Sequence, residues 1–352
     1  MEAHKPEASI VELLTTYNEL NSSRIEELDE EPSPLEFMRY VARNTPFVVR
    51  RGAQDWTATR TWDAAYLCSA LTGHKVNVAV TPYGNADAPT PDGRGHIVFA
   101  KPHEEDQEFS EFLEHLIRQE KASSLDDEQE AKKWAEVRYA QTQNDNLRHE
   151  YISLFSQVER SIAFARIALE RDPDAINMWI GNSRSVTALH RDNYENIYVQ
   201  IAGCKHFVLL PPLFQPCVNE QDLEPATYVR ARDEDQAEGE EGEGEGRFLL
   251  RMDETADENG DGVPKIPFAT WDPDAPGVCA TPYSHLAEPI RVTLEPGDML
   301  YLPAMWYHKV SQSCSKDGIC VAVNYWYDMD FSGPLYSLCS FVRNMSRKEV
   351  NS

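Results

Sequence analysis

The chain has 352 residues, of which 41% are apolar, and its 33 basic and 59 acidic side chains give a formal net charge of -26. This length allows one large domain or two small ones that bury about three quarters of the unfolded surface, so a stable core needs no disulfides. The 7 cysteines are odd in number and form no C-x-x-C pair, which argues against a disulfide-rich secreted scaffold and against a thiolate zinc site.

Two helices are predicted at the start of the chain. The apolar residues that follow Pro6 have the spacing of one helical face, and they are Ile10, Leu13, Leu14, Tyr17 and Leu20. A second helix is predicted to begin at Ser33 and Pro34, because proline is favoured at the first helical position. Residues 1–45 are therefore expected to form a helical N-terminal region.

From residue 46 to about residue 145, strands and helices are predicted to alternate. Strands are expected at 47–49 and 76–80, where β-branched and aromatic residues gather. Helices are expected at 62–71 and 112–117, and Gly73 is predicted to end the first of them.

Strands dominate the rest of the chain. They are predicted, from their β-branched and aromatic residues, at 175–180, 196–201, 206–210, 290–294, 299–302 and 320–327. Turns at Gly203 and at 295–298 separate neighbouring strands. This alternation of short strands and turns is typical of a closed or two-sheet antiparallel fold. The main domain is therefore expected to span 46–330, followed by a C-terminal helix within 331–352.

An acidic insertion interrupts these strands at about 231–262. It contains 13 acidic and 3 basic residues, a local balance of -10, and a Glu-Gly run at 238–246. Such a segment is too charged and too rich in glycine to pack, so we predict that it is disordered. More than a third of the net charge therefore belongs to a surface insertion.

The termini and the charge bear on compartment and partners. The first six residues carry no apolar signal segment, and no run approaches the roughly 18 apolar residues of a membrane span. We therefore expect a protein of the cytoplasm or nucleus without membrane contact. The acidic excess repels phosphate, so direct nucleic-acid binding is not expected, whereas a cationic partner and simple solubility both remain open.

A candidate metal site starts from His190 and Asp192, whose side chains point to one face of an extended segment. With 10 histidines and 59 acids in 352 residues, one to two such pairs arise by chance, so the pair alone is weak. Two further residues strengthen it, namely His308 in an apolar aromatic run and Lys205 on a predicted strand. Together they match the facial triad of non-haem Fe(II) oxygenases, with a lysine for the far carboxylate of a dicarboxylate cosubstrate. The alternatives are a core histidine bonded to a carbonyl and a surface lysine.

Several longer motifs carry a resemblance to a known family. They are "TALHRDNYENIYVQIAGCKHFVLLPP" (187–212), "GDMLYLPAMWYHKV" (297–310), "VAVNYWYDM" (321–329), "VAVTPYGNADA" (78–88) and "YAQTQNDNL" (139–147). Over roughly residues 33–340 the chain resembles the JmjC/cupin-like Fe(II)- and 2-oxoglutarate-dependent oxygenases, and most of all the small lysyl hydroxylases among them. The chain departs from the family pattern at the insertion 231–262 and in a longer stretch at 313–318, which puts the substrate entrance in question.

The resemblance implies a mainly β fold with flanking helices (α+β), a double-stranded β-helix or jelly roll of the cupin-like JmjC type. It places the iron ligands at His190, Asp192 and His308. It also implies a 2-oxoglutarate pocket, and the residues expected to line that pocket or the region near the iron are Tyr139, Thr187, Asn196, Tyr198, Lys205 and Asn324, with Trp179 and Trp326 as walls.

The function implied by the resemblance is carbon hydroxylation of a lysine in a GTP-binding protein of the developmentally regulated type, with Fe(II), 2-oxoglutarate and O₂. Removal of methyl groups from methyl-lysine and cleavage of histone tails are alternatives within the same family. A cupin-like binding module without catalysis is a third, and the presence of all three ligands together with Lys205 disfavours it. The two terminal helices form either a homodimer interface or packing on the flank of the barrel.

Overall fold

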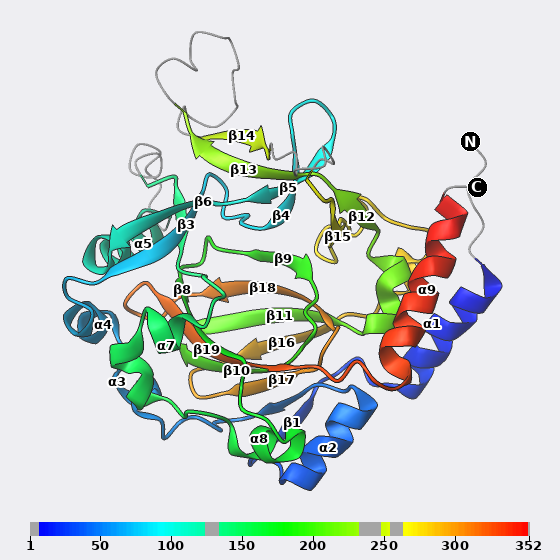
Figure 1. Cartoon of the computed structure of the whole chain (residues 1–352), viewed down its shortest axis with the longest axis horizontal. Helices are drawn as coiled ribbons and strands as arrows, with labels where there is room; N and C mark the ends of the chain where they lie inside the picture. The colour runs from blue at the N-terminus through cyan, green and yellow to red at the C-terminus, as the bar shows by residue number, and fades with distance from the viewer. Residues whose placement is uncertain (1–6, 124–133, 232–247, 254–262, 351–352) are drawn as a thin grey trace.

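The computed structural model describes residues 7–123, 134–231, 248–253 and 263–350. Two β-sheets stacked face to face form its centre (Figure 1). The larger sheet has six strands in the spatial order β1 (Glu26–Leu28), β2 (Phe47–Val49), β17 (Met299–Leu302), β10 (Tyr194–Ala202), β19 (Cys320–Asp328) and β8 (Ala175–Gly181). The smaller sheet has four, in the order β16 (Ile290–Leu294), β11 (Cys204–Leu210), β18 (Tyr307–Ser313) and β9 (Thr187–His190).

Eight central strands build these two sheets, and along the chain β8 to β11 alternate between them, as do β16 to β19. The alternation is interrupted once, because β11 and β16 both belong to the four-stranded sheet and pair with each other. Within each sheet these strands are antiparallel, β10 lying between β17 and β19, and β11 between β16 and β18. This topology is the double-stranded β-helix, or jelly roll. The predicted fold class, mainly β with flanking helices, is therefore confirmed.

The alternation of side chains along β19 shows why the inside of the jelly roll can be polar. Val321, Val323 and Tyr325 belong to the hydrophobic core on the outer face of the six-stranded sheet, whereas Ala322 belongs to the core between the sheets. Because successive side chains of a strand point to opposite faces, Asn324 also faces the interior. The outer core supplies the apolar burial, which leaves interior positions free for polar residues.

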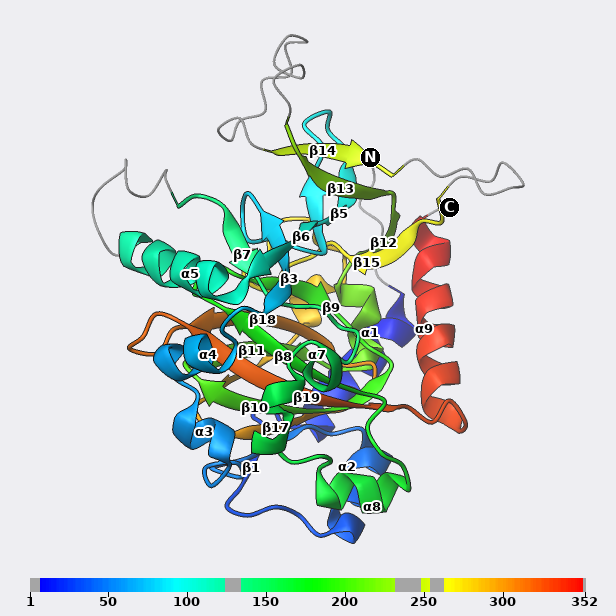
Figure 2. The same ribbon diagram turned by 60° about the vertical axis from the view of Figure 1, so that its left-hand side comes forward.

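Three shorter sheets lie beyond β9 at one end of the jelly roll (Figure 2). The first has the order β6 (His103–Glu108), β3 (Lys75–Thr81) and β7 (Val137–Tyr139). The second has the order β14 (Phe248–Met252), β13 (Pro225–Arg230), β5 (Ile97–Lys101) and β4 (Ala88–Pro91), and the third pairs β12 (Glu220–Leu223) with β15 (Ile266–Ala269).

The helices lie around the central sheets and not between them (Figures 1 and 2). They are α1 (Ala8–Leu20), α2 (Pro34–Arg43), α3 (Thr57–Thr61), α4 (Ala64–Ala70), α5 (Phe109–Ser123), α7 (Asn146–His149), α8 (Ala163–Leu169) and α9 (Pro334–Val350), with 3-10 turns η1 (Ile152–Gln157), η2 (Pro212–Cys217) and η4 (Ser284–Leu286). In the described parts of the chain, none of them is both long and apolar enough to cross a membrane.

Capping side chains set two of the helix starts. The Ser33 hydroxyl accepts from the Glu36 backbone N–H and the Glu36 carboxylate accepts from the Ser33 N–H, a capping box that confirms the predicted start of α2. The helix predicted at 62–71 is present as α4, which begins two residues later and ends one residue earlier than predicted. Asp63 sets its start, since its carboxylate caps α4 by accepting from the Tyr66 N–H at 2.8 Å.

The expectation that the whole of 231–262 is disordered is wrong in part. Phe248–Met252 form β14, which pairs in antiparallel fashion with β13, while residues 232–247 and 254–262 lie outside the described residues. Two acidic strands, β1 and β6, were not predicted, because neither shows an apolar pattern. β1 nevertheless joins the six-stranded sheet by parallel pairing with β2.

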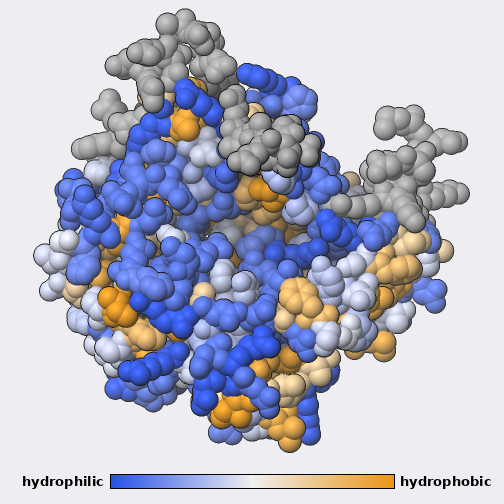
Figure 3. All heavy atoms as spheres, viewed as in Figure 1, coloured by the Kyte–Doolittle hydropathy of each residue, from blue (hydrophilic) through white to orange (hydrophobic). Residues whose placement is uncertain are grey.

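The first and last helices pack on one flank of the jelly roll. Ile10 and Leu14 of α1 are buried in a cluster to which Met345 of α9 also contributes, and the two helices lie side by side in both views (Figures 1 and 2). On the other face of α9, Leu338 and Phe341 are exposed, and hydrophobic side chains gather on this flank in Figure 3. A homodimer would use that exposed face.

Candidate metal centre and adjoining cavity

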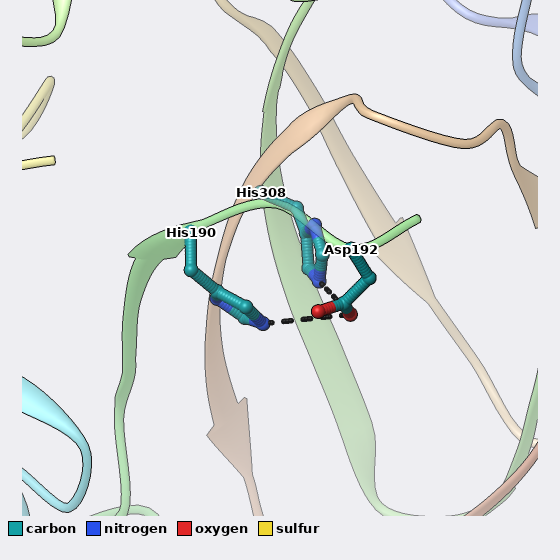
Figure 4. A group of neighbouring side chains, drawn as sticks. All are labelled: His190, Asp192 and His308. Atoms are coloured by element: carbon teal, nitrogen blue, oxygen red, sulfur yellow. Dashed lines mark ion pairs between the residues drawn. The ribbon is translucent and has the colours of Figure 1, made fainter. Parts of the chain in front are cut away.

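Three side chains converge at the end of the jelly roll nearest the shorter sheets. His190 ends β9, Asp192 follows two residues later, and His308 lies opposite His190 on β18. Their ligand atoms all lie within 4.8 Å of one another, and Asp192 Oδ2 is 3.7 Å from Nε2 of each histidine. Figure 4 shows the two rings and the carboxylate turned toward a common point.

Backbone hydrogen bonds orient both imidazole rings. Nδ1 of His190 lies 2.8 Å from the Ala188 carbonyl oxygen, and Nδ1 of His308 lies 3.0 Å from the Trp306 carbonyl oxygen. A carbonyl oxygen only accepts, so in each ring Nδ1 carries the proton and donates it. Each Nε2 is left with a lone pair directed at Asp192, which is the tautomer that a metal ligand requires.

Burial favours the same neutral state of His308. It lowers the pKa of His308 to about 4, with a further contribution from the neighbouring ring of His190 and an opposing one from Asp192. The carbonyl oxygen of Asp192 accepts from the Met305 N–H at 2.7 Å, which ties the segment after β9 to the segment before β18. The three ligands are therefore held by two backbone segments that are fixed to each other.

The donor set fits Fe(II). Two imidazole nitrogens and one carboxylate oxygen on one face form the facial triad, which leaves further coordination positions open on the opposite side. A structural zinc site would instead close its coordination with a fourth protein ligand. Among the described residues, these three form the group of histidine, cysteine or acidic side chains that lie close enough together to share one ion.

The triad lines a cavity of about 710 Å³. All the residues proposed from the sequence for the cosubstrate line the same cavity, namely Tyr139, Thr187, Asn196, Tyr198, Lys205 and Asn324, together with Trp179 and Trp326. A hydrogen-bonded chain fixes three of them, since Trp179 Nε1 donates to Asn324 Oδ1 at 2.9 Å and Asn324 Nδ2 donates to Asn196 Oδ1 at 3.2 Å. Segments far apart in the sequence thus meet at one site.

The ammonium of Lys205 is buried in the wall of this cavity. Lys205 is 2% exposed, and its Nζ donates to the Tyr139 hydroxyl at 2.8 Å. Burial works against its charge, yet the oxygens of Tyr139 and Tyr198 and the thiol of Cys320 raise its pKa above the ordinary value, while burial also raises the pKa of Tyr139. In the described residues no carboxylate forms an ion pair with Lys205, so a buried cation faces the cavity without an anion.

Several lining residues could not be recognised from the sequence. They are Asp87 and Glu104 from the shorter sheets, Gln141 after β7, Glu220 of β12, Phe268 of β15 and Arg343 of α9. Phe268 stacks parallel to the His190 ring at 6.5 Å between centroids. Asp87 and Gln141 lie within the motifs quoted above, at 78–88 and 139–147, but no local pattern assigns any of these residues to the site. The packing of distant elements brings them to the cavity that the triad lines.

The comparison with known families agrees with this geometry. Residues 32–333 match the model of the cupin-like domain. The chain belongs to the cupin-like JmjC family. Among proteins of this family, it is 35% identical over 305 residues to the human "Bifunctional peptidase and (3S)-lysyl hydroxylase JMJD7", which covers 86% of this chain and 84% of the relative.

Two other members of the family are similar over most of their length. The Arabidopsis thaliana "Lysine-specific demethylase JMJ32" is 34% identical over 340 residues, 93% of this chain and 88% of the relative. The Dictyostelium discoideum "JmjC domain-containing protein E" is 31% identical over 327 residues, 90% of this chain and 88% of the relative. The names of these relatives thus describe two different reactions on lysine, hydroxylation and demethylation.

Proposed function

We propose that this protein is an Fe(II)- and 2-oxoglutarate-dependent oxygenase that hydroxylates a carbon atom of a lysyl side chain in a protein substrate. The observation that carries the proposal is the pairing, in one cavity, of the His190, Asp192 and His308 triad with the buried cation of Lys205. The triad fits Fe(II), and the cation fits the far carboxylate of a dicarboxylate whose near end reaches the metal. The name of the human relative supports the choice of hydroxylation.

Each part of the site then has a role. His190, Asp192 and His308 would hold the metal, and Lys205 and Tyr139 would fix 2-oxoglutarate by its distal carboxylate, with Thr187 beside them. Asn196, Tyr198 and Asn324 would shape the space near the metal. When bound, Fe(II) supplies the activation of O₂ that protein side chains lack. In the net reaction one oxygen atom enters the lysyl C–H bond and the other enters succinate, which is formed with loss of CO₂.

The proposed partner is a GTP-binding protein of the developmentally regulated type, in the cytoplasm or nucleus. This choice rests on the resemblance to the small lysyl hydroxylases. The large acidic excess of the chain, with a net charge of -26, suits a basic substrate segment.

Mass spectrometry of product peptides tests the proposal. Anaerobically purified protein is loaded with Fe(II) and 2-oxoglutarate, exposed to air, and incubated with lysine-bearing peptides from such GTP-binding proteins. The expected result is the gain of one oxygen atom on a lysine, and a variant with His190→Ala and Asp192→Ala should produce none. Absence of both product and succinate with the wild-type protein would refute an oxygenase.

Demethylation is the second candidate, and the name of the Arabidopsis relative favours it. The same experiment with methylated lysine peptides separates the two reactions, because demethylation removes a methyl group whereas hydroxylation adds an oxygen atom. Shortened peptides would instead indicate the peptidase activity in the name of the human relative.

A further inference from the structure

The carboxylates that line the cavity differ in whether a cationic side chain pairs with them. Four carboxylates line it, at Asp87, Glu104, Asp192 and Glu220. Asp192 belongs to the metal triad, and Glu220 forms ion pairs with Arg191 at 3.4 Å and with Arg343 at 2.6 Å. Two carboxylates, Asp87 and Glu104, therefore remain to be accounted for.

Asp87 and Glu104 both line the cavity. In the described part of the chain neither forms an ion pair, and the nearby Lys101 is already paired with Asp253. Burial raises the pKa of Asp87, and the carboxylate of Glu104 raises it further, against a hydrogen bond of 2.9 Å from Gln141 Nε2. Asp87 is half-buried and Glu104 is exposed. A half-buried carboxylate that shares a cavity with a second negative charge is favoured when a cation joins the two.

The segment before β4 holds Asp87 next to the triad. The carbonyl oxygen of Gly84 accepts from the Val186 N–H at 3.1 Å, just before β9 and His190. The contact leaves no room for a side chain at position 84, since a Cβ there would lie 2.1 Å from the Arg184 carbonyl oxygen. Asp87 directly precedes β4, which contacts β9, and Asp87 and His190 line the same cavity.

We propose that Asp87, with Glu104 beside it, is the subsite that recognises the ε-ammonium of the target lysine. The inference rests on the proposed function and adds the residue that selects the side chain. Asp87 and the triad line the same cavity, so an ammonium held by Asp87 would keep the aliphatic carbons of the same side chain in the cavity that contains the metal ligands. An ammonium group offers three donors and a full charge, which Asp87, oriented by Gln141, and Glu104 can share.

The proposal makes the subsite selective for charge. A cavity wall built to bind a cation rejects an isosteric neutral group, because its carboxylates are then left desolvated and unpaired. Unmodified lysine should therefore bind better than acetyl-lysine or norleucine, which carry no charge at the end of the side chain.

The test uses small probes, so that it does not depend on knowing the natural substrate. The probes are capped single residues, N-acetyl-lysine methylamide and its norleucine analogue, and their binding is measured by saturation-transfer NMR on protein loaded with Zn(II) and 2-oxoglutarate. Wild-type protein should bind the lysine probe and not the norleucine probe. In Asp87→Asn the affinity for the lysine probe should fall roughly 30-fold or more.

Asp106→Asn is the matched control, because Asp106 is an exposed carboxylate on the same strand as Glu104 and does not line the cavity. It removes the same charge and should change the affinity less than twofold. Should Asp87→Asn fail to fold, Glu104→Gln at an exposed position must still weaken lysine binding severalfold. Equal binding of both probes by wild-type protein, or unchanged lysine binding in Asp87→Asn and Glu104→Gln, overturns the proposal.

Failure of the proposed function gives a different result. A protein without oxygenase activity forms no succinate from 2-oxoglutarate, whatever its affinity for the probes. A protein that forms succinate but does not distinguish lysine from norleucine keeps the oxygenase assignment and loses the Asp87 subsite.

Discussion

The Nζ atom of Lys205 lies 2.8 Å from the Tyr139 hydroxyl, although the two residues are 66 positions apart in the sequence. Lys205 belongs to β11 of the jelly roll and Tyr139 to β7 of a shorter sheet. A phenol accepts a hydrogen bond but does not neutralise an ammonium, so the contact orients Lys205 and leaves its charge available. Among the residues that the structure describes, the ammonium of Lys205 therefore has no anionic partner, and it lies where a carboxylate ligand in the cavity can bind it.

Substitution of Lys205 by methionine tests the role of its charge in two ways, through the affinity for 2-oxoglutarate and through the stability of the unliganded fold. Lys205→Met keeps the length of the side chain and removes its charge, so the KM for 2-oxoglutarate should rise on the order of 100-fold. The stability of the unliganded protein in urea should fall, because the oxygens of Tyr139 and Tyr198 and the thiol of Cys320 favour the charged ammonium in the folded state. Kinetics of succinate formation and urea unfolding measure the two effects.

Tyr139→Phe is the companion variant. It removes one neutral oxygen and leaves the ammonium in place, so the expected rise in KM is smaller, roughly fivefold. An unchanged KM in Lys205→Met would show that the cosubstrate binds elsewhere in the cavity.

Metal binding should stabilise the protein through the triad alone. Mn(II) at about 100 times its Kd should raise the free energy of unfolding by about 2.7 kcal/mol, seen as a higher Tm in the absence of O₂ chemistry. His308→Ala should abolish the shift. His285→Ala, at an exposed histidine of η4, is the control and should retain it. A shift that persists in His308→Ala would place the metal outside the triad.

The family resemblance supplied the jelly roll, and β9 and β18 were not predicted as strands. The sequence alone was sufficient for the other six of the eight central strands, because each carries its own apolar pattern. It was also sufficient for the pairing of His190 with Asp192, since two residues along an extended chain return to the same face. His308 could be added as a third candidate ligand from its apolar aromatic setting, and the family resemblance then implied the same ligand. The strands themselves set its position, because β18 pairs with β9 at these two histidines.

Some of the elements that sequence reasoning missed lack an apolar pattern, whereas β5 was missed although its residues are mostly apolar. β6 consists almost entirely of charged and polar residues and is held by backbone pairing with β3. Asp63 moves the start of the helix predicted at 62–71 to Ala64, because its carboxylate caps the first turn. The roles of Asp87 and Arg343 depend on contacts between distant elements, which no local pattern contains.

Glu220 connects the C-terminal helix to the metal ligands. Its side chain is 4% exposed and pairs with Arg343 of α9 and with Arg191, which stands between His190 and Asp192 in the sequence. The Tyr307 hydroxyl, one residue before His308, also donates to Glu220 at 3.3 Å. One carboxylate therefore braces both ligand-bearing segments against α9.

Glu220→Gln should weaken both the fold and the metal site. It leaves two partly buried guanidinium groups without an anion, which should reduce the free energy of unfolding by about 3 kcal/mol. The metal ligands lose their brace, so Mn(II) affinity should fall roughly 10-fold or more. Glu224→Gln, at an exposed carboxylate paired with Lys265, should cost less than about 1 kcal/mol. Equal losses in the two variants would contradict the bracing role.

His115 of α5 gives the protein a pH dependence that is separate from the metal site. It is 6% exposed, and its Nε2–H donates to the Glu136 carbonyl at 2.8 Å. Burial lowers the pKa of His115 to about 4, and the positive charge of Arg138 contributes to the lowering. The folded protein therefore keeps His115 neutral across a pH range in which an unfolded chain protonates it.

Stability should fall as the pH falls from about 6.5 toward 4, because the unfolded state binds a proton at His115 that the folded state does not. The loss attributable to this residue is at most about 3 kcal/mol, from a difference of about 2.5 in pKa at 1.36 kcal/mol per unit. Urea unfolding of metal-free protein at pH 7.0 and 4.5 measures it, with His115→Gln as the reference that cannot titrate. The wild-type protein should lose more stability than the variant between these two pH values. A parallel loss in both would show that His115 has an ordinary pKa in the folded state.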